Sequence, residues 1–104
     1  MSRQITRQAV NAMFNRENFK KSNTEVIYNE IDQVSFMYLF GNLIAILNYN
    51  TKELTITTAG WDTNTTRERL NGLPRVYVYR SKGQLYLNGT PWDGNAETLQ
   101  VYIH

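Results

Sequence analysis

Apolar residues recur at helical spacing near the start of the chain and at strand spacing through most of the remainder. Between residues 4 and 19 the apolar positions make a single stripe on one side of a helix. The stripe consists of Ile5, Ala9, Val10, Met13 and Phe14. This pattern predicts an amphipathic helix over residues 4–19. Lys20 and Lys21 would suit its C-terminal end, where cations meet the negative end of the helix dipole.

From residue 24 onward the pattern changes to runs rich in Val, Ile, Tyr, Phe and Thr, which favour strands. Turn residues separate four such runs, and these predict strands at residues 24–28, 34–40, 42–48 and 52–58. In the fourth run apolar and polar residues alternate, which indicates a strand with one exposed face. The second run is apolar on both faces, so we expect that strand in the middle of the sheet with one face against a helix.

A second, short helix is predicted to begin near Thr65. Residues Thr65 to Glu68 match a capping box, in which the threonine hydroxyl and the glutamate carboxylate each accept from a free backbone N–H. Leu70 and Leu73 would face the core. The glycine and proline that follow would end the helix after about two turns.

The last third of the chain again predicts strands. Residues 75–79 and 84–88 are expected to form a hairpin, and only a loop with an even number of residues keeps their aliphatic side chains on one face. Alternation near the C-terminus predicts a closing strand. The whole pattern predicts one α+β domain over residues 1–104. It would have an N-terminal helix and a short second helix against an antiparallel sheet of six or seven strands.

Composition narrows the chemistry that this domain could perform. The chain contains no cysteine, and its one histidine, His104, is the last residue. Thiolate metal sites, cysteine nucleophiles and an internal serine–histidine triad are therefore excluded. We expect a protein that is not an enzyme and that has no cofactor and no metal site. A signal peptide and a membrane-length apolar run are both missing, so we expect a cytoplasmic protein without a membrane partner.

Charge is grouped along the chain although the formal net charge is only +2. Residues 1–21 and 65–82 are basic, and residues 22–64 are acidic. The simpler interpretation is that the basic segments neutralise the acidic one across the fold. The alternative is a basic face that meets phosphates or an acidic partner protein.

The predicted hairpin carries one candidate binding site. If its aliphatic side chains face the core, Arg75, Tyr77, Tyr79 and Tyr86 share the opposite face, and a four-residue loop would place Tyr77 opposite Tyr86. Basic faces that bear tyrosines are typical of surfaces that hold single-stranded nucleic acid. The simpler interpretation is that the tyrosines stabilise the strand pair or lie beneath a helix.

A second candidate site surrounds the start of the second helix. Thr65, Thr66 and Arg67 are placed to hold a phosphate or carboxylate at the helix N-terminus, with Trp61 close by. The simpler interpretation is that a threonine only caps the helix and that Trp61 packs over it. Trp92 poses the same choice, because it would anchor a loop if buried and form a contact if exposed.

Residues 60–71 also carry a resemblance to a known group of proteins. Their pattern of Gly-Trp, a polar stretch and Thr-Thr-Arg-x-Arg-Leu-Asn resembles a segment of small tailed-bacteriophage proteins of unknown function. A looser resemblance covers residues 7–14 and 85–94. The resemblance implies an accessory protein made in the cytoplasm of the infected bacterial host cell, and it supplies no catalytic residue.

We therefore expect a small non-enzymatic phage accessory protein that binds a host or viral protein, for example to inhibit host defence or transcription. The alternative is a single-stranded nucleic-acid-binding protein that uses its basic helix and tyrosine face. Open sheet edges would also allow a homodimer. The expected contact surface comprises Trp61, Arg67, Arg69, Tyr77, Tyr79 and Tyr86.

Overall fold

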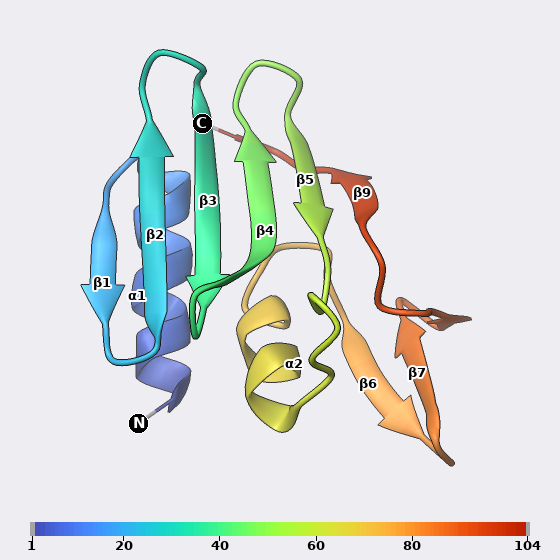
Figure 1. The fold of residues 1–104 in the computed structure, drawn as a ribbon. Coiled ribbons are helices and arrows are strands. Elements are labelled where there is room, and N and C mark those ends of the chain that lie inside the picture. Colours follow the sequence, from blue (N-terminus) through green and yellow to red (C-terminus); the bar gives the residue numbers. More distant parts are fainter. Residues whose placement is uncertain (1, 104) are drawn as a thin grey trace.

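The computed structural model describes residues 2–103, which form two helices and nine strands (Figure 1). Six strands make one sheet in the order β1-β2-β3-β4-β5-β9, and three make a second sheet in the order β6-β7-β8. All neighbouring strands are antiparallel. The predicted α+β class is confirmed, with the strands divided between two sheets.

The helices are α1 (Ser2–Phe14) and α2 (Asn64–Leu70). The first sheet contains β1 (Phe19–Lys21), β2 (Thr24–Asn29), β3 (Val34–Leu39), β4 (Asn42–Asn48), β5 (Glu53–Ile56) and β9 (Glu97–Gln100). The second sheet contains β6 (Val78–Ser81), β7 (Gln84–Leu87) and β8 (Thr90–Pro91).

Helix α1 ends earlier than its apolar stripe predicts. Arg16 adopts a left-handed φ of 58°, and the Glu17 N–H donates to the Ala12 carbonyl at 2.9 Å. This is the hydrogen bond of a Schellman C-cap, which reverses the chain. The prediction that Lys20 and Lys21 end the helix is therefore wrong, because both residues lie in β1 and pair with β2.

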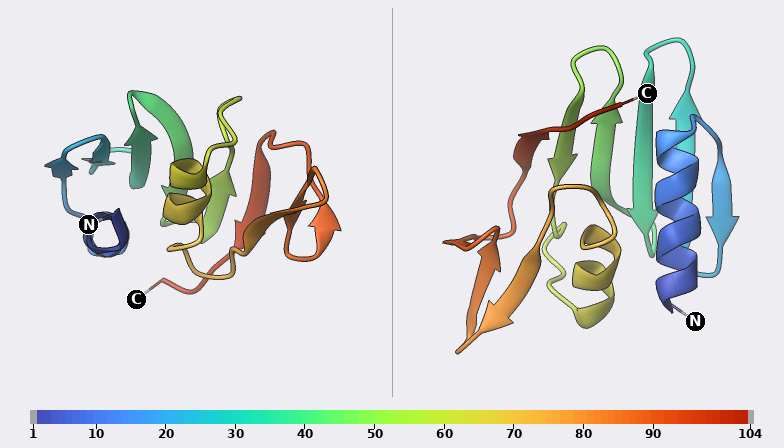
Figure 2. Two further views of the ribbon diagram at one scale, coloured as in Figure 1. Left: turned by 90° about the horizontal axis from the view of Figure 1, so that it is seen from below. Right: turned by 180° about the vertical axis from the view of Figure 1, so that it is seen from behind.

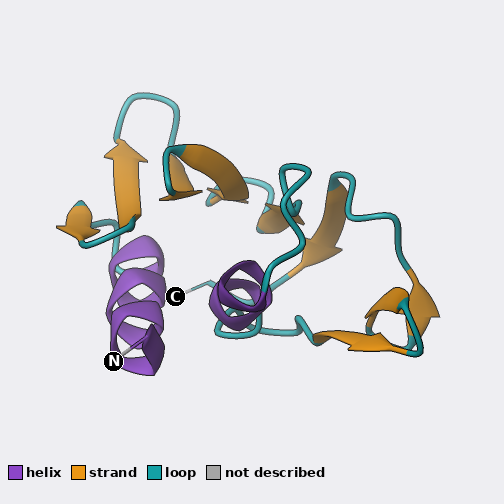
Figure 3. Ribbon diagram, turned by 60° about the horizontal axis from the view of Figure 1, so that its bottom comes forward, coloured by secondary structure: helices purple, strands orange, loops and turns teal. Residues whose placement is uncertain are grey.

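The first sheet has one covered face and one open face. Both helices lie on the same side of its strands (Figures 2 and 3). On β3, Ser35, Met37 and Leu39 are buried toward the helices, whereas the alternate residues are only partly buried. We call the side that bears the helices the inner face and the opposite side the outer face. As predicted, β3 is a central strand with one face against a helix.

Tyr49, just after β4, connects the sheet to α1. Its hydroxyl donates to the Met13 carbonyl and lies 2.5 Å from Ser35 Oγ. The Arg16 guanidinium lies 4.3 Å from the centre of the Tyr49 ring, which is a cation–π distance. These contacts fix the C-terminal end of α1 against the inner face.

Arg69 on α2 is buried, with only 1% of its surface exposed. Its Nε donates to Thr24 Oγ1 at 2.9 Å, and its Nη1 donates to Thr6 Oγ1 at 2.8 Å and to the Glu68 carboxylate. Its Nη2 donates to Asn23 Oδ1 at 3.2 Å. One guanidinium thus joins α1, α2 and the start of β2, and we call these five residues the Arg69 cluster.

The two helices approach closely at this cluster. Thr6 Oγ1 donates to Glu68 Oε1 at 2.7 Å, so one threonine hydroxyl connects the arginine and the carboxylate. A Cβ atom on Gly72 would collide with Thr6 Cγ2. The absence of a side chain at residue 72 therefore lets the end of α2 lie against the first turns of α1.

We expect Arg69→Met to lower the free energy of unfolding by about 3 kcal/mol, because the aliphatic side chain would leave buried hydroxyl and amide groups without their donor. The measurement is equilibrium unfolding in urea. Arg80→Met is the matched control, since Arg80 also pairs with a carboxylate but is 44% exposed. Arg80→Met should lower the free energy of unfolding by at most about 1 kcal/mol. Equal losses in the two variants would contradict a structural role for the Arg69 cluster.

Burial raises the pKa of Tyr49 above its ordinary value of 10.0, and the Ser35 hydrogen bond and Arg16 oppose this shift. Because the folded-state pKa exceeds the unfolded-state value, the neutral tyrosine stabilises the fold below pH 10, and this stability is lost as pH rises through the folded pKa. We expect the stability gap between wild type and Tyr49→Phe to narrow above pH 10 in urea titrations.

Candidate functional site

The tyrosines of the second sheet lie in a row with a register that differs from the predicted one. A two-residue turn at Lys82 and Gly83 pairs Tyr79 with Tyr86, so the prediction that Tyr77 faces Tyr86 is wrong. The turn is tighter because left-handed φ values at residues 82 and 83 close it in two residues. The loop length is still even, and the aliphatic residues of the hairpin are buried as predicted.

The rings of this row contact one another. Ring centres of Tyr79 and Tyr86 are 5.1 Å apart with planes 12° from parallel, and those of Tyr77 and Tyr79 are 4.9 Å apart. Tyr77 is 62% exposed. Arg75, predicted to share this face, instead donates to the Gln100 carbonyl at 3.4 Å. Much of the ring surface that would stack on bases is therefore used within the row.

The N-cap of α2 lies two residues earlier in the chain than the sequence predicts. Thr63 is the N-cap, and its side chain accepts from the Thr66 N–H at 3.1 Å. Thr66 is buried and its hydroxyl lies 3.0 Å from that of Thr63. The predicted capping box is wrong because Glu68 turns toward Arg69 and Thr6. Of the groups expected to hold an anion, Thr66 bonds to Thr63 and Arg67 bonds to Asp62, while Thr65 lies partly buried at the helix start.

Two further candidate binding residues, Arg69 and Trp92, are inside the fold. Arg69 belongs to the buried Arg69 cluster. Trp92 is 7% exposed, and its Nε1 donates to the Asn95 carbonyl at 2.9 Å. Arg69 is therefore not at the surface where we expected it, whereas the burial of Trp92 agrees with the simpler interpretation, in which it anchors a loop.

Trp61 lies at a hollow that includes Phe40, a residue that the sequence analysis did not select. The hollow encloses about 310 Å³ and is lined mainly by apolar atoms. Leu39 and Ile44 are almost fully buried beneath it, while Phe40 is 70% and Trp61 is 61% exposed. We call this hollow, with Thr58, Thr63 and its other lining residues, the aromatic pocket.

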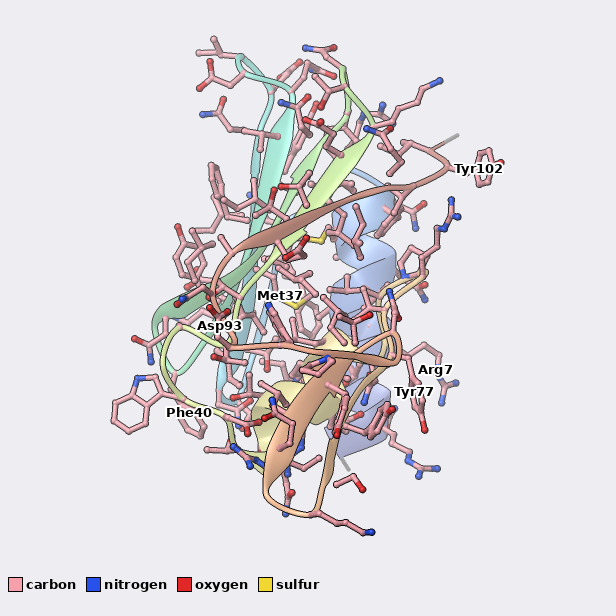
Figure 4. The ribbon with its side chains drawn as sticks, turned by 90° about the vertical axis from the view of Figure 1, so that its right-hand side faces the viewer. Arg7, Met37, Phe40, Tyr77, Asp93 and Tyr102 are labelled. Carbon is pink, nitrogen blue, oxygen red and sulfur yellow. The ribbon has the colours of Figure 1, made fainter. Side chains whose placement is uncertain are left out.

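A β-bulge and two tight turns build the aromatic pocket. The register between β3 and β4 shifts after Met37, which leaves Ile44 and its neighbour Ala45 both buried. Phe40 and Gly41 have φ values of 51° and 79°, and Ala59 and Gly60 have values of 56° and 83°. Successive left-handed residues are typical of type I′ turns, which reverse the chain in two residues. Phe40 projects on the side of the sheet away from α1 (Figure 4).

A three-residue ion-pair network begins next to the aromatic pocket, at the residue that follows Trp61 in the chain. Asp62, next to Trp61, accepts from Arg67 Nη1 at 2.5 Å and from Arg80 Nε. Arg67 also donates to the Asn64 side chain. Two guanidinium groups share one carboxylate here, so the network carries one net positive charge. Arg67, which we expected to hold a phosphate or carboxylate at the start of α2, is paired here with a carboxylate of the chain itself.

The sequence contains a local signal that the side chain of Phe40 is exposed. Phe40 precedes a glycine between two strand patterns, where Asn or Gly is the ordinary choice for a left-handed residue. A large apolar side chain in such a turn cannot reach the core. The proximity of Phe40 to Trp61, by contrast, depends on how β3 and α2 pack, and no local pattern indicates it.

The structure also limits other kinds of site within residues 2–103. In this range no group of three or more His, Cys, Asp or Glu side chains is placed to hold a metal ion. No helix of the described residues is long and apolar enough to cross a membrane.

Comparison with known proteins identifies the family. A family model described as Kyanoviridae Gp96 protein matches residues 2–101, from the first helix to the end of the last strand. No curated protein and no solved structure matches the chain. The phage origin that the sequence resemblance implied is thereby confirmed. The chain belongs to the Kyanoviridae Gp96 family of bacteriophage proteins.

Proposed function

We propose that this phage protein is a non-enzymatic accessory protein that binds a host or viral protein through the aromatic pocket. One observation carries the proposal. Two large aromatic side chains, Phe40 and Trp61, line an apolar hollow and are both mostly exposed to solvent. Exposed aromatic residues around a concave apolar surface are typical of the small set of residues that dominate binding energy at protein interfaces.

Folding by itself gives no reason for a phenylalanine at residue 40. A left-handed conformation costs a bulky residue about 1 kcal/mol more than it costs glycine or asparagine. Because Phe40 is 70% exposed, burial returns little of this cost in the isolated chain. Contact with a partner would bury the ring and account for its presence.

The charges next to the aromatic pocket indicate the chemistry of the partner. The network of Asp62, Arg67 and Arg80 has one positive charge in excess, and Arg80 is 44% exposed. A complementary partner therefore inserts an apolar side chain into the pocket and places a carboxylate near the arginines. In the proposed setting, the cytoplasm of the infected cell, such binding would block a surface of a host defence or transcription protein.

We expect Phe40→Asn and Trp61→Ala each to weaken binding of the partner by at least about tenfold. The partner is first captured by cross-linking in extracts of infected cells, and binding is then measured with purified proteins by calorimetry. Phe40→Asn should also raise the free energy of unfolding by about 0.5–1 kcal/mol, since asparagine tolerates the left-handed turn. A loss of affinity without a loss of stability cannot come from misfolding.

Ile31→Asn is the matched control for this experiment. Ile31 is 94% exposed in the β2–β3 turn and takes no part in the aromatic pocket. Its replacement should leave the affinity unchanged. Partner binding that is as tight in Phe40→Asn and Trp61→Ala as in wild type would refute the proposed surface.

The nucleic-acid alternative has its own test. We expect no mobility shift of a single-stranded oligonucleotide, even at low salt, because the tyrosine rings contact one another and Arg80 is paired with Asp62. A shift that weakens steeply with added salt and disappears in Tyr77→Ser would favour nucleic-acid binding instead.

A further inference from the structure

The outer face of the first sheet is apolar at its centre. Six apolar side chains project from it on three adjacent strands, and we call them the outer patch. The outer patch consists of Ile27 on β2, Val34, Phe36 and Tyr38 on β3, and Leu43 and Ile46 on β4. The strand registers place them side by side, since Ile27 pairs with Phe36, Phe36 pairs with Ile46, and Tyr38 pairs with Leu43.

The outer patch is separate from the core. The partly buried apolar residues that pack against the core include Phe14, Phe19 and Leu99, and no residue of the outer patch is among them. Ile27 is 41% exposed, and the other five members are partly exposed. Figure 1 looks onto this face, with α1 behind the strands and no helix in front of them. A contiguous apolar face of this kind on one chain is typical of an interaction surface.

Charged residues occupy only the margins of this face. On one side Lys20 of β1 pairs in register with Glu25 of β2, so opposite charges are adjacent. On the other side Glu53 of β5 pairs with Asn48. The centre holds no charge that would select a basic or acidic partner, and it is complementary to another uncharged apolar face.

We propose that the outer patch binds the outer patch of a second copy of this chain, so that two sheets pack face to face around a two-fold axis. Such an arrangement is isologous, because the same residues meet from both copies. Packed sheets lie about 10 Å apart with their strands roughly 30° from parallel. This interface differs from the aromatic pocket and does not depend on the function proposed for it.

The dimensions of the sheet suit a dimer. Six strands at about 4.8 Å spacing and about six residues per central strand give a face of roughly 24 Å by 20 Å. This footprint is on the order of 500 Å², and the relief of the side chains makes the accessible area larger. A stable interface buries about 800 Å² on each partner. Face-to-face packing therefore comes near the size of a standard interface without any change in the fold.

The arrangement of residues on this face is also self-complementary. With the two-fold axis parallel to the strands and between β3 and β4, β3 of one copy crosses β4 of the second. Phe36 then meets Ile46 of the second copy, twice in each dimer. Asn29, Val34, Asn48 and Glu53 form one row across β2 to β5, with Asn29 and Glu53 at its two ends. The two-fold axis exchanges these ends, so Glu53 of each copy meets the Asn29 amide of the second copy and not another carboxylate.

The test is analytical ultracentrifugation of the full chain from about 1 μM to about 500 μM. Wild type should approach twice the 12.1 kDa mass of one chain as its concentration rises. Phe36→Lys and Ile46→Glu should each remain monomeric over this range, because each would bury an unpaired charge twice in the dimer. Asn11→Lys, on the exposed side of α1, is the control and should dimerise like wild type.

A mixture of the two variants makes the test specific for face-to-face packing. In a mixed dimer, the lysine of the Phe36→Lys chain meets the glutamate of the Ile46→Glu chain, so the two charges are paired. At the second contact, the unchanged Ile46 of the first chain meets the unchanged Phe36 of the second. The mixture should therefore show the mass of a dimer. Circular dichroism confirms that each variant is folded. A wild type that stays monomeric at every concentration would assign the outer patch to another partner and overturn the proposal. Folded variants that still dimerise, or a mixture that stays monomeric, would also overturn it.

Discussion

The guanidinium of Arg69 holds the helical layer of this protein together. Its donors reach Thr6 on α1, Asn23 and Thr24 at the start of β2, and Glu68 beside it on α2. A buried arginine is stable only where its charge and its N–H groups are all satisfied, so this one position requires that both helices and the sheet meet at a single point. The loop that carries Trp61 leads directly into α2, and its place beside β3 follows from that junction.

A chain of 104 residues has too little helix to cover both faces of a six-stranded sheet. Both helices lie on the inner face, where Tyr49 and the Arg69 cluster hold them. The apolar side chains at the centre of the outer face have no helix over them. Stability therefore comes from one layer of helices on one face, and the surface available for binding comes from the other.

Left-handed turns and exposed aromatic side chains occur together at the aromatic pocket. The turns at Phe40 and Ala59 both contain left-handed residues. Residues in or next to each turn line the aromatic pocket. Asp62 ties Arg67 of α2 to Arg80 of the second sheet next to this pocket. Residues 39–44 and residues 58–66 thus meet around one apolar hollow, and no charged residue is among the described residues that line it.

Local patterns in the sequence predicted the strands from β2 to β5 well, because alternation with a period of two reports directly which face of a strand is buried. The prediction for the N-terminal helix placed its C-terminal end at residue 19, whereas α1 ends at Phe14. Its apolar stripe has no sharp limit, and the left-handed turn at Arg16 that ends it leaves no glycine as a signal. The short second helix was predicted correctly, but its N-cap is Thr63 and not Thr65, because several threonines in this segment offer equivalent hydroxyls.

The sequence by itself determined the α+β class, the central position of β3 and the lack of thiol or internal imidazole chemistry, since composition and short-range periodicity are sufficient for these conclusions. Only the tertiary structure decided that Arg69 and Trp92 are buried, that Phe40 lies beside Trp61 and that Tyr79 rather than Tyr77 faces Tyr86. The reason is physical. An arginine can be buried only where distant residues supply its acceptors, and Thr6 and Thr24 are brought to Arg69 by folding alone.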